Sequence, residues 1–308
     1  MKILLISGFL GAGKTTFIKE LIRQTDVKAV VMENEYGDNN LDSLDIQNAA
    51  NKKDELKVLE FMEGCVCCTM KDSFVNSVFA IYSSLEPEYL IIEPTGVGRL
   101  SNILSNLSPL LGDKISLLKP CVIISPDGYD ENMRQWQALY EDQVKNAQVV
   151  VFSKCENTDS DIIRRVSDRV KELNPGAEII STHYSRMEEG WWNDLLDIGA
   201  SENMGEQTND EDSDISFTQV SVSKAGLHNV GELVTFLEDC LHGEFGKVAR
   251  AKGTLWVDNE FLRFDLADRM YLITGSADDN CQCVVIGQGL DEKKIKGRLS
   301  PGRKTLKL

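Results

Sequence analysis

Residues 8–16 read Gly-Phe-Leu-Gly-Ala-Gly-Lys-Thr-Thr, and they directly follow the apolar run 2–7, Lys-Ile-Leu-Leu-Ile-Ser. This stretch satisfies the pattern G-x-x-x-x-G-K-[ST] in the strand-to-helix context that a phosphate-binding loop requires. The glycines let backbone N–H groups turn onto phosphate oxygens, Lys14 reaches the β- and γ-phosphates, and the Thr15 hydroxyl is a ligand for Mg²⁺. We therefore predict a nucleoside triphosphate site formed by Gly11, Ala12, Gly13, Lys14, Thr15 and Thr16.

The residues that follow the glycines of the loop predict a helix from Lys14 to about Arg23. The N-terminal dipole of this helix would face the phosphates. Strand patterns recur at residues 2–6, 28–32, 56–61, 88–92, 119–124, 147–152 and 177–180, with helical stretches between several of them. Alternation of this kind predicts an α/β fold with a doubly wound, mostly parallel sheet over the first ~190 residues.

Residues 201–214 contain six acids and no bases, which is typical of a flexible linker. An alternating strand from 216 to 222, an amphipathic helix from 227 to 241 and further β-like runs follow it. The sequence therefore predicts a P-loop domain over residues 1–200, an acidic linker over 201–214 and a smaller α+β domain over 215–308.

Composition limits the partners. The chain has 308 residues and a formal net charge of −16, whereas a nucleic-acid binder needs a basic surface, so we expect no nucleic-acid partner. No apolar run approaches the roughly 20 residues of a membrane helix, and the N-terminus leads into the phosphate loop rather than into a signal peptide. We expect a cytoplasmic protein without a membrane partner.

A second motif, Glu93-Pro94-Thr95-Gly96, follows the buried-type strand 89–92. In P-loop enzymes an acid at this place holds Mg²⁺, and a glycine two or three residues later can donate its N–H to the γ-phosphate. Glu93 and Gly96 fit these roles, and with Lys14 they are the predicted catalytic residues. An acid at a strand end is otherwise a solvated surface group, so this prediction depends on the phosphate loop.

A third motif places Cys65, Cys67 and Cys68 within four residues, between the strand 56–61 and a helix that starts near Met70. Neighbouring thiols that close are a poor disulfide framework, but reduced thiolates are soft ligands suited to Zn²⁺ and other transition metals. Three cysteines do not close a tetrahedral site, so a further ligand or an open position is expected. Inert buried cysteines are the alternative.

The combination of residues 8–16, Glu-Asn-Glu-Tyr-Gly at 33–37, Gly-Cys-Val-Cys-Cys at 64–68 and Glu-Pro-Thr-Gly at 93–96 resembles the CobW family of P-loop GTPases. The segments 250–257 and 285–287 resemble that family's second domain. The likeness thus spans nearly the whole chain.

The resemblance implies GTP hydrolysis coupled to delivery or insertion of a metal into a client metalloprotein. It also implies that Glu33 and Asp38 join Cys65, Cys67 and Cys68 in a transition-metal site, although residues 33–36 alone would read as an ordinary acidic turn. The expected ligands are GTP or GDP, Mg²⁺, and Zn²⁺ or another transition metal such as Co²⁺ or Ni²⁺. The sequence leaves open whether the protein forms a homodimer. It also leaves open an alternative function, in which the protein is a nucleotide-dependent activation factor for a metallo- or corrinoid enzyme and transfers no metal itself.

One departure from the family concerns the nucleobase. The base-recognition motif Asn-Lys-x-Asp is represented by Ser153-Lys154-Cys155-Glu156, after the strand 149–152. Lys154 can cover the base and Glu156 can accept from guanine, but Glu156 is one methylene longer than aspartate and Ser153 lacks an amide. We therefore predict Ser153, Lys154 and Glu156 as base-site residues with a preference for GTP that does not exclude ATP.

Overall fold

The structure is a computed structural model, and it describes residues 1–25, 27–35, 57–62, 70–200, 217–267 and 269–300. The described residues group into two compact units, one up to residue 200 and one from residue 217, and each unit has its own sheet and core. The predicted acidic linker at 201–214 lies outside the described residues, and the predicted domain boundaries stay a prediction.

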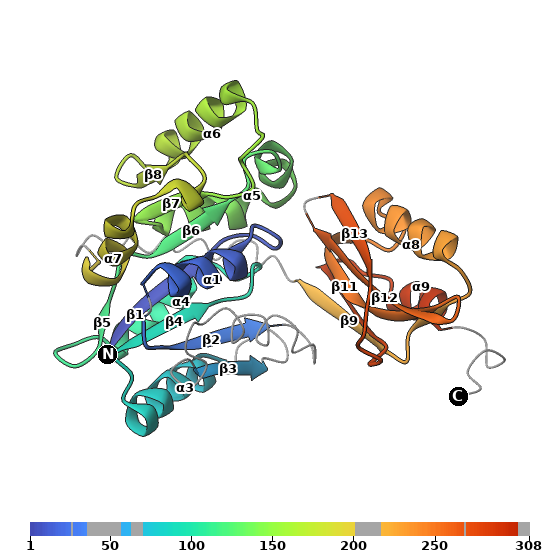
Figure 1. Cartoon of the computed structure of the whole chain (residues 1–308), viewed down its shortest axis with the longest axis horizontal. Helices are drawn as coiled ribbons and strands as arrows, with labels where there is room; N and C mark the ends of the chain where they lie inside the picture. Colours follow the sequence, from blue (N-terminus) through green and yellow to red (C-terminus); the bar gives the residue numbers. More distant parts are fainter. Residues whose placement is uncertain (26, 36–56, 63–69, 201–216, 268, 301–308) are drawn as a thin grey trace. The chain divides into compact units, whose positions relative to one another are not determined.

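The first unit alternates strands and helices along the chain (Figure 1). Its elements are β1 (Lys2–Ser7), α1 (Lys14–Thr25), β2 (Ala29–Glu35), β3 (Lys57–Met62), α3 (Met70–Leu85), β4 (Tyr89–Glu93), α4 (Leu100–Leu107), β5 (Ser116–Leu117), β6 (Cys121–Ile124), α5 (Tyr129–Asn146), β7 (Val149–Phe152), α6 (Ser160–Leu173), β8 (Glu178–Ile180) and α7 (Glu189–Asp197), with single 3₁₀ turns at Ser108–Leu110 and Tyr184–Arg186.

These strands form one sheet in the order β3-β2-β4-β1-β6-β7-β8, and β5 also pairs with β1. Every pairing described in this sheet is parallel. The doubly wound, mostly parallel sheet predicted from the sequence is therefore confirmed. β2 runs to Glu35 rather than ending at residue 32, because its pairing with β4 continues to Glu33 and its pairing with β3 continues to Glu35.

The core of the first unit explains the apolar character of its strands, since strands covered on both faces are apolar throughout. Leu4 and Ile6 of β1 share one buried cluster with Phe17 of α1 and Trp192 of α7. The rings of Phe17 and Trp192 lie 5.3 Å apart, so α1 and α7 pack together over that face of the sheet. The phosphate loop thus connects a strand and a helix that share this buried cluster.

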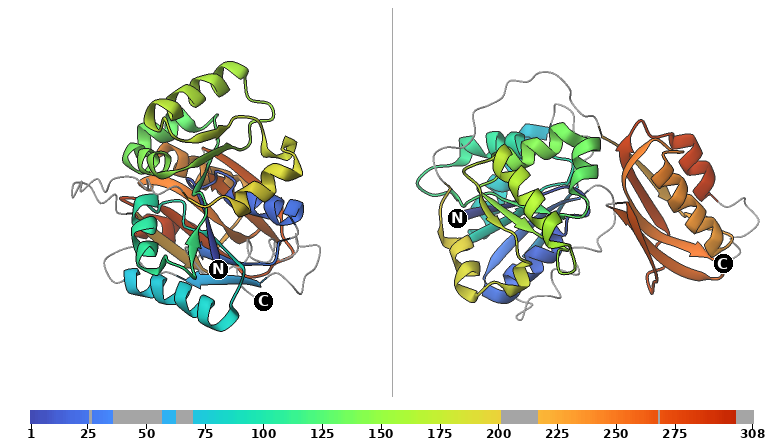
Figure 2. Two further views of the ribbon diagram at one scale, coloured as in Figure 1. Left: turned by 90° about the vertical axis from the view of Figure 1, so that its left-hand side faces the viewer. Right: turned by 90° about the horizontal axis from the view of Figure 1, so that it is seen from above.

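The second unit is an antiparallel sheet with two helices on one face (Figure 2). Its elements are β9 (Thr218–Ser223), β10 (Gly226–Leu227), α8 (Val230–His242), β11 (Lys247–Val257), β12 (Glu260–Ala267), β13 (Met270–Gly275), β14 (Gln282–Gln288) and α9 (Glu292–Leu299). The strand order is β13-β12-β11-β14-β9, with β10 beside β11. The predicted smaller α+β domain is confirmed in its fold class.

The start of α8 corrects the predicted helix of residues 227–241. Gly226 and Leu227 pair with β11 as β10, and α8 begins only at Val230. The Asn229 side chain accepts a hydrogen bond from the Glu232 N–H at 3.0 Å, which is a favourable N-cap and sets the helix start.

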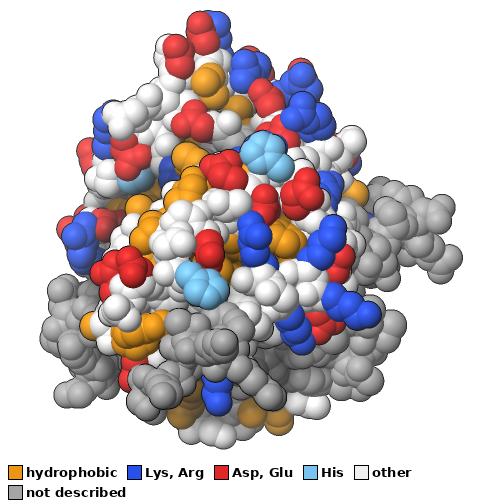
Figure 3. All heavy atoms as spheres, turned by 90° about the vertical axis from the view of Figure 1, so that its right-hand side faces the viewer, with side chains coloured by type: hydrophobic (Ala, Val, Ile, Leu, Met, Phe, Trp, Pro, Cys, Tyr) orange, Lys and Arg blue, Asp and Glu red, His pale blue; other side chains and the backbone are white. Residues whose placement is uncertain are grey.

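The surface carries charges of both signs. On the face that Figure 3 presents, acidic and basic side chains are interspersed among the described residues rather than forming one continuous basic surface. No helix in the described part of the chain is long and apolar enough to cross a membrane.

Candidate nucleotide and metal site

The phosphate loop connects β1, which ends at Ser7, to α1, which begins at Lys14. Three of its glycines have positive φ angles: +142° at Gly8, +78° at Gly11 and +91° at Gly13. Side chains with a Cβ rarely adopt such angles, so the loop depends on glycine at these positions. The first α-helical bond runs from the Phe17 N–H to the Gly13 carbonyl at 3.0 Å, so the preceding N–H groups project from the positive end of α1.

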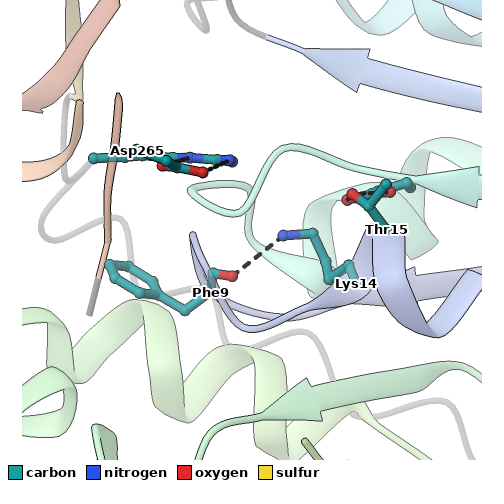
Figure 4. A network of polar contacts seen from close by, with 6 residues as sticks. Phe9, Lys14, Thr15 and Asp265 are labelled. Atoms are coloured by element: carbon teal, nitrogen blue, oxygen red, sulfur yellow. Dashed lines mark hydrogen bonds and ion pairs between the residues drawn. The ribbon is translucent and has the colours of Figure 1, made fainter. Parts of the chain in front are cut away.

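Lys14 is the buried cation of the loop. Its side chain folds back so that Nζ donates to the carbonyl oxygens of Gly8 at 3.1 Å and Phe9 at 3.2 Å, as Figure 4 shows for Phe9. Lys14 is only 6% exposed, and a buried charge needs such partners. The neighbouring Thr16 is exposed in the first turn of α1. The loop therefore concentrates positive charge where phosphate oxygens would bind.

Thr15 and Glu93 bring the first two motifs together. The Thr15 hydroxyl lies 3.0 Å from both carboxylate oxygens of Glu93, which ends β4, the neighbour of β1 in the sheet. A hydroxyl and a carboxylate are the oxygen ligands that Mg²⁺ prefers. The residues present thus fit the predicted magnesium site at the carboxyl edge of the sheet.

Gly96 touches the phosphate loop directly. A Cβ added at Gly96 would lie 2.5 Å from the backbone nitrogen of Leu10, so only glycine allows this approach. The backbone of the Glu93–Gly96 motif therefore packs on the phosphate loop.

Helix α5 supports this arrangement through residues that the sequence analysis missed. Gln143, which is 1% exposed, donates from Nε2 to the carbonyl oxygens of Gly96 at 3.4 Å and Gly98 at 3.1 Å. Asp142 accepts from the backbone N–H of Ser101 at 3.1 Å and from its hydroxyl. No sequence motif marks these residues, because their partners lie more than forty positions away.

The same helix also contacts the phosphate loop. The ring of Phe9 lies 5.9 Å from that of Trp136 and 5.6 Å from that of Tyr140. Trp136 interrupts the helical geometry of α5 with φ −131° and ψ 34°. α5 thus touches both the loop that would hold the phosphates and the turn at 96–98.

Glu33, one of the two acids predicted to bind the transition metal, lies beside Glu93, the acid predicted to bind Mg²⁺. Glu33 of β2 is in register with Glu93 of β4, and register partners in parallel strands project to the same side of a sheet. Glu33 is 2% exposed. On the other side of β2, Glu60 of β3 is in register with Glu33.

The remaining predicted metal ligands, Asp38, Cys65, Cys67 and Cys68, lie outside the described residues. Within the described part of the chain, no group of three or more histidine, cysteine or acidic side chains could hold a metal ion. The transition-metal site therefore stays a prediction.

At the base end, Ser153 and Lys154 differ in their surroundings. The Ser153 hydroxyl is buried and donates to the Ala12 carbonyl at 2.5 Å, which ties β7 to the phosphate loop. Lys154 is exposed and has a positive φ of 54°. Burial raises the pKa of the intervening Cys155 thiol, so this cysteine is not an activated thiolate.

Glu156 borders a cavity of about 500 Å³. Its side chain is 51% exposed, and its Oε1 lies 3.2 Å from Nε2 of His183. The cavity is lined by Cys155, Glu156, Thr158, Ser160, Ile163, Arg164, Ser167, Ser181, Thr182, His183 and Arg186. The predicted base loop and the segment 181–186 thus line one cavity.

Comparison with known families gives two matches that together cover most of the chain. The nucleotide-binding domain of the CobW/HypB/UreG family matches residues 2–181. The C-terminal domain of the cobalamin synthesis protein CobW matches residues 217–301.

Among curated relatives, the zinc chaperone YjiA of Escherichia coli is 24% identical over 321 residues, covering 97% of this chain and 98% of the relative. The zinc-regulated GTPase metalloprotein activator 1 of Dictyostelium discoideum is 24% identical over 209 residues, covering 57% of this chain and only 44% of that protein. The crystal structure of Zn(II)-bound YjiA GTPase from E. coli aligns over 97% of each chain, with 19% identity and a TM-score of 0.47.

Proposed function

The chain belongs to the CobW/HypB/UreG family, and on that premise we propose that it is a GTP-hydrolysing metal chaperone. It would deliver or insert a transition metal into a client metalloprotein or cofactor pathway. The names of its relatives, a zinc chaperone and a zinc-regulated GTPase metalloprotein activator, support this proposal.

The nucleotide chemistry follows from the phosphate end of the site. Backbone N–H groups of residues 11–16 and the Lys14 ammonium would hold the phosphates, Thr15 and Glu93 would hold Mg²⁺, and the Gly96 N–H would contact the γ-phosphate. A Mg²⁺ ion held there would supply neutralisation of the negative charge that develops on the phosphates. Hydrolysis at such a site rests on positioning and charge stabilisation, so we expect slow turnover that a client or metal accelerates.

The observation that carries the coupling of nucleotide to metal is the register of Glu33 with Glu93. Glu93, assigned to Mg²⁺, ends β4, and Glu33, assigned to the transition metal, lies opposite it two residues before the end of β2. A change at the γ-phosphate that moves the end of β4 would act directly on the end of β2. A ligand shifts such an equilibrium by its different affinities for the two states, and the effect is reciprocal.

Zinc is the first candidate for the cargo, because the relatives are named for zinc and because thiolates with carboxylates suit Zn²⁺. Co²⁺ and Ni²⁺ are accepted by the same donor types. At the base end, Lys154 and Glu156 give a preference for guanine, and ATP is the competing nucleotide.

The experiment is a titration of the reduced protein with Zn²⁺, carried out without nucleotide, with GDP and with a non-hydrolysable GTP analogue. The wild type is compared with Cys67→Ser and with the matched control Cys281→Ser, which alters a half-buried cysteine of the second unit. We expect stoichiometric binding that Cys67→Ser weakens and Cys281→Ser does not, with an affinity that differs between the GDP and GTP-analogue samples.

A zinc affinity that changes neither in Cys67→Ser nor between the nucleotide samples would contradict the proposed chaperone function. That result would favour the alternative, an activation factor that remodels a metallo- or corrinoid enzyme without transferring metal. Co²⁺ and Ni²⁺ titrations of the same samples then decide whether another cargo metal restores the dependence on Cys67.

A further inference from the structure

The Glu156 carboxylate is held in place by a residue from a distant segment. A half-exposed glutamate side chain has considerable rotamer freedom, which it loses on binding a ligand. Here Oε1 lies 3.2 Å from Nε2 of His183, which comes from the segment 181–186 that also lines the cavity. The extra methylene of glutamate over aspartate gives the carboxylate the reach for this contact.

The contacts of the His183 ring identify which of its nitrogens carries the proton. The Ser185 N–H donates to Nδ1 at 3.3 Å, and the Ser185 hydroxyl lies 2.8 Å from the same nitrogen. Nδ1 is therefore an acceptor, so Nε2 carries the N–H of the ring and faces Glu156.

The ring of His183 is also fixed by packing. It stacks on Tyr184 with ring centroids 4.2 Å apart, and Tyr184 in turn contacts Phe17 of α1. The His183 side chain is 12% exposed, whereas His228 and His242 are 58% and 70% exposed. Among the three histidines, His183 alone is held on a buried support beside a predicted ligand-binding acid.

We propose that His183 is a positioning residue for the nucleobase, and that its Nε2–H orients the Glu156 carboxylate toward the paired N–H donors of guanine. This inference rests on the proposed function, because it takes residues 153–156 as the base loop. Guanine offers N1–H and an exocyclic amino group side by side, whereas adenine presents an acceptor at N1. An oriented carboxylate therefore favours GTP over ATP, and a mobile one favours it less.

The test measures dissociation constants of the whole protein for non-hydrolysable analogues of GTP and ATP. His183→Phe keeps a ring on Tyr184 but removes the donor, whereas His183→Gln keeps an N–H donor. We expect His183→Phe to weaken the GTP analogue about tenfold, as for a lost hydrogen bond to a charged group, and the ATP analogue less than twofold. His183→Gln should recover most of the loss, and the exposed control His242→Phe should change neither constant.

Shortening the acid tests the same contact from the other side. Glu156→Asp withdraws the carboxylate from His183, so we expect selectivity for GTP to fall. The plain motif interpretation expects it to rise, because aspartate is the usual residue of that motif. This variant serves if His183→Phe does not fold, as judged by thermal unfolding.

An unchanged ratio of the two dissociation constants in His183→Phe, or a raised GTP selectivity in Glu156→Asp, would overturn the role of His183. Glu156→Ala separates this failure from that of the base-site assignment. If Glu156→Ala lowers GTP selectivity and His183→Phe does not, only the role of His183 fails. If Glu156→Ala leaves selectivity unchanged, the base-site assignment itself is wrong.

Discussion

The two ends of the candidate nucleotide site are built in different ways. The phosphate end consists of glycines with positive φ, a buried lysine and a glycine that leaves no room for a Cβ. The base end consists of side chains, with Lys154 exposed and the carboxylate of Glu156 reaching His183. Backbone geometry therefore limits which residues can form the first end, whereas contacts between side chains form the second.

This difference explains where the chain departs from the usual motifs. The phosphate loop matches its pattern fully, since each glycine angle or close contact excludes other residues. The base loop has Ser153 and Glu156 in place of asparagine and aspartate. The Ser153 hydroxyl still ties the predicted base loop to the phosphate loop, because it donates to the Ala12 carbonyl. A hydroxyl thus makes a structural contact at the position where the motif has an asparagine amide.

The largest effect should follow from Lys14→Ala, because it removes the one cation that the loop itself holds at the phosphates. We expect GTP turnover, measured as phosphate release, to fall by at least ~100-fold. The control Lys145→Ala removes an exposed lysine that pairs with Glu141 on α5 and should leave turnover unchanged. Full turnover in Lys14→Ala would contradict the proposed hydrolysis mechanism. It would also contradict the comparison of the two ends, because the buried lysine would not be needed at the phosphate end.

Gly96→Ala should come next. Its Cβ would lie 2.5 Å from the Leu10 backbone, so the turn must move away from the phosphate loop. We expect turnover to fall by roughly 30-fold and the free energy of unfolding to fall by about 1–3 kcal/mol, as in overpacked sites. Gly112→Ala is the matched control, because nothing lies within 4 Å of the added Cβ. Wild-type turnover in Gly96→Ala would show that the turn need not touch the loop.

Gln143→Leu tests the support that α5 gives to the phosphate end. Without the bonds to Gly96 and Gly98 the turn is less ordered, so we expect kcat to fall about tenfold while GDP affinity changes less than twofold. Gln137→Leu on the exposed side of the same helix is the control. An equal loss of GDP and GTP affinity would mean that Gln143 supports the whole fold rather than the γ-phosphate contact.

The smallest effect is expected for Ser153→Ala. It removes the bond to the Ala12 carbonyl, so GTP and ATP analogues should both weaken by about threefold, with their ratio unchanged. Competition binding with the two analogues measures this ratio. A changed ratio of the affinities for the GTP and ATP analogues would indicate that Ser153 contacts the base. Ser153 would then belong to both ends of the site.

Much of the fold could be predicted from the sequence, because the parallel sheet depends on apolar strand patterns that are local. The phosphate loop and the Glu93–Gly96 motif were predicted as parts of one site, and the structure places Thr15 against Glu93 and Gly96 against Leu10. The start of α8 was missed because pairing of Gly226 and Leu227 with β11 outweighed the helical pattern.

The linear pattern alone was sufficient for the doubly wound fold and for the phosphate loop, because hydrophobic periodicity and glycine requirements act over neighbouring residues. Only the tertiary structure revealed the contacts of Gln143 with the turn at 96–98, the register of Glu33 with Glu93, and the pairing of His183 with Glu156. These contacts join segments far apart in the chain. The folded backbone brings such residues together, and no local spacing in the sequence encodes their distance.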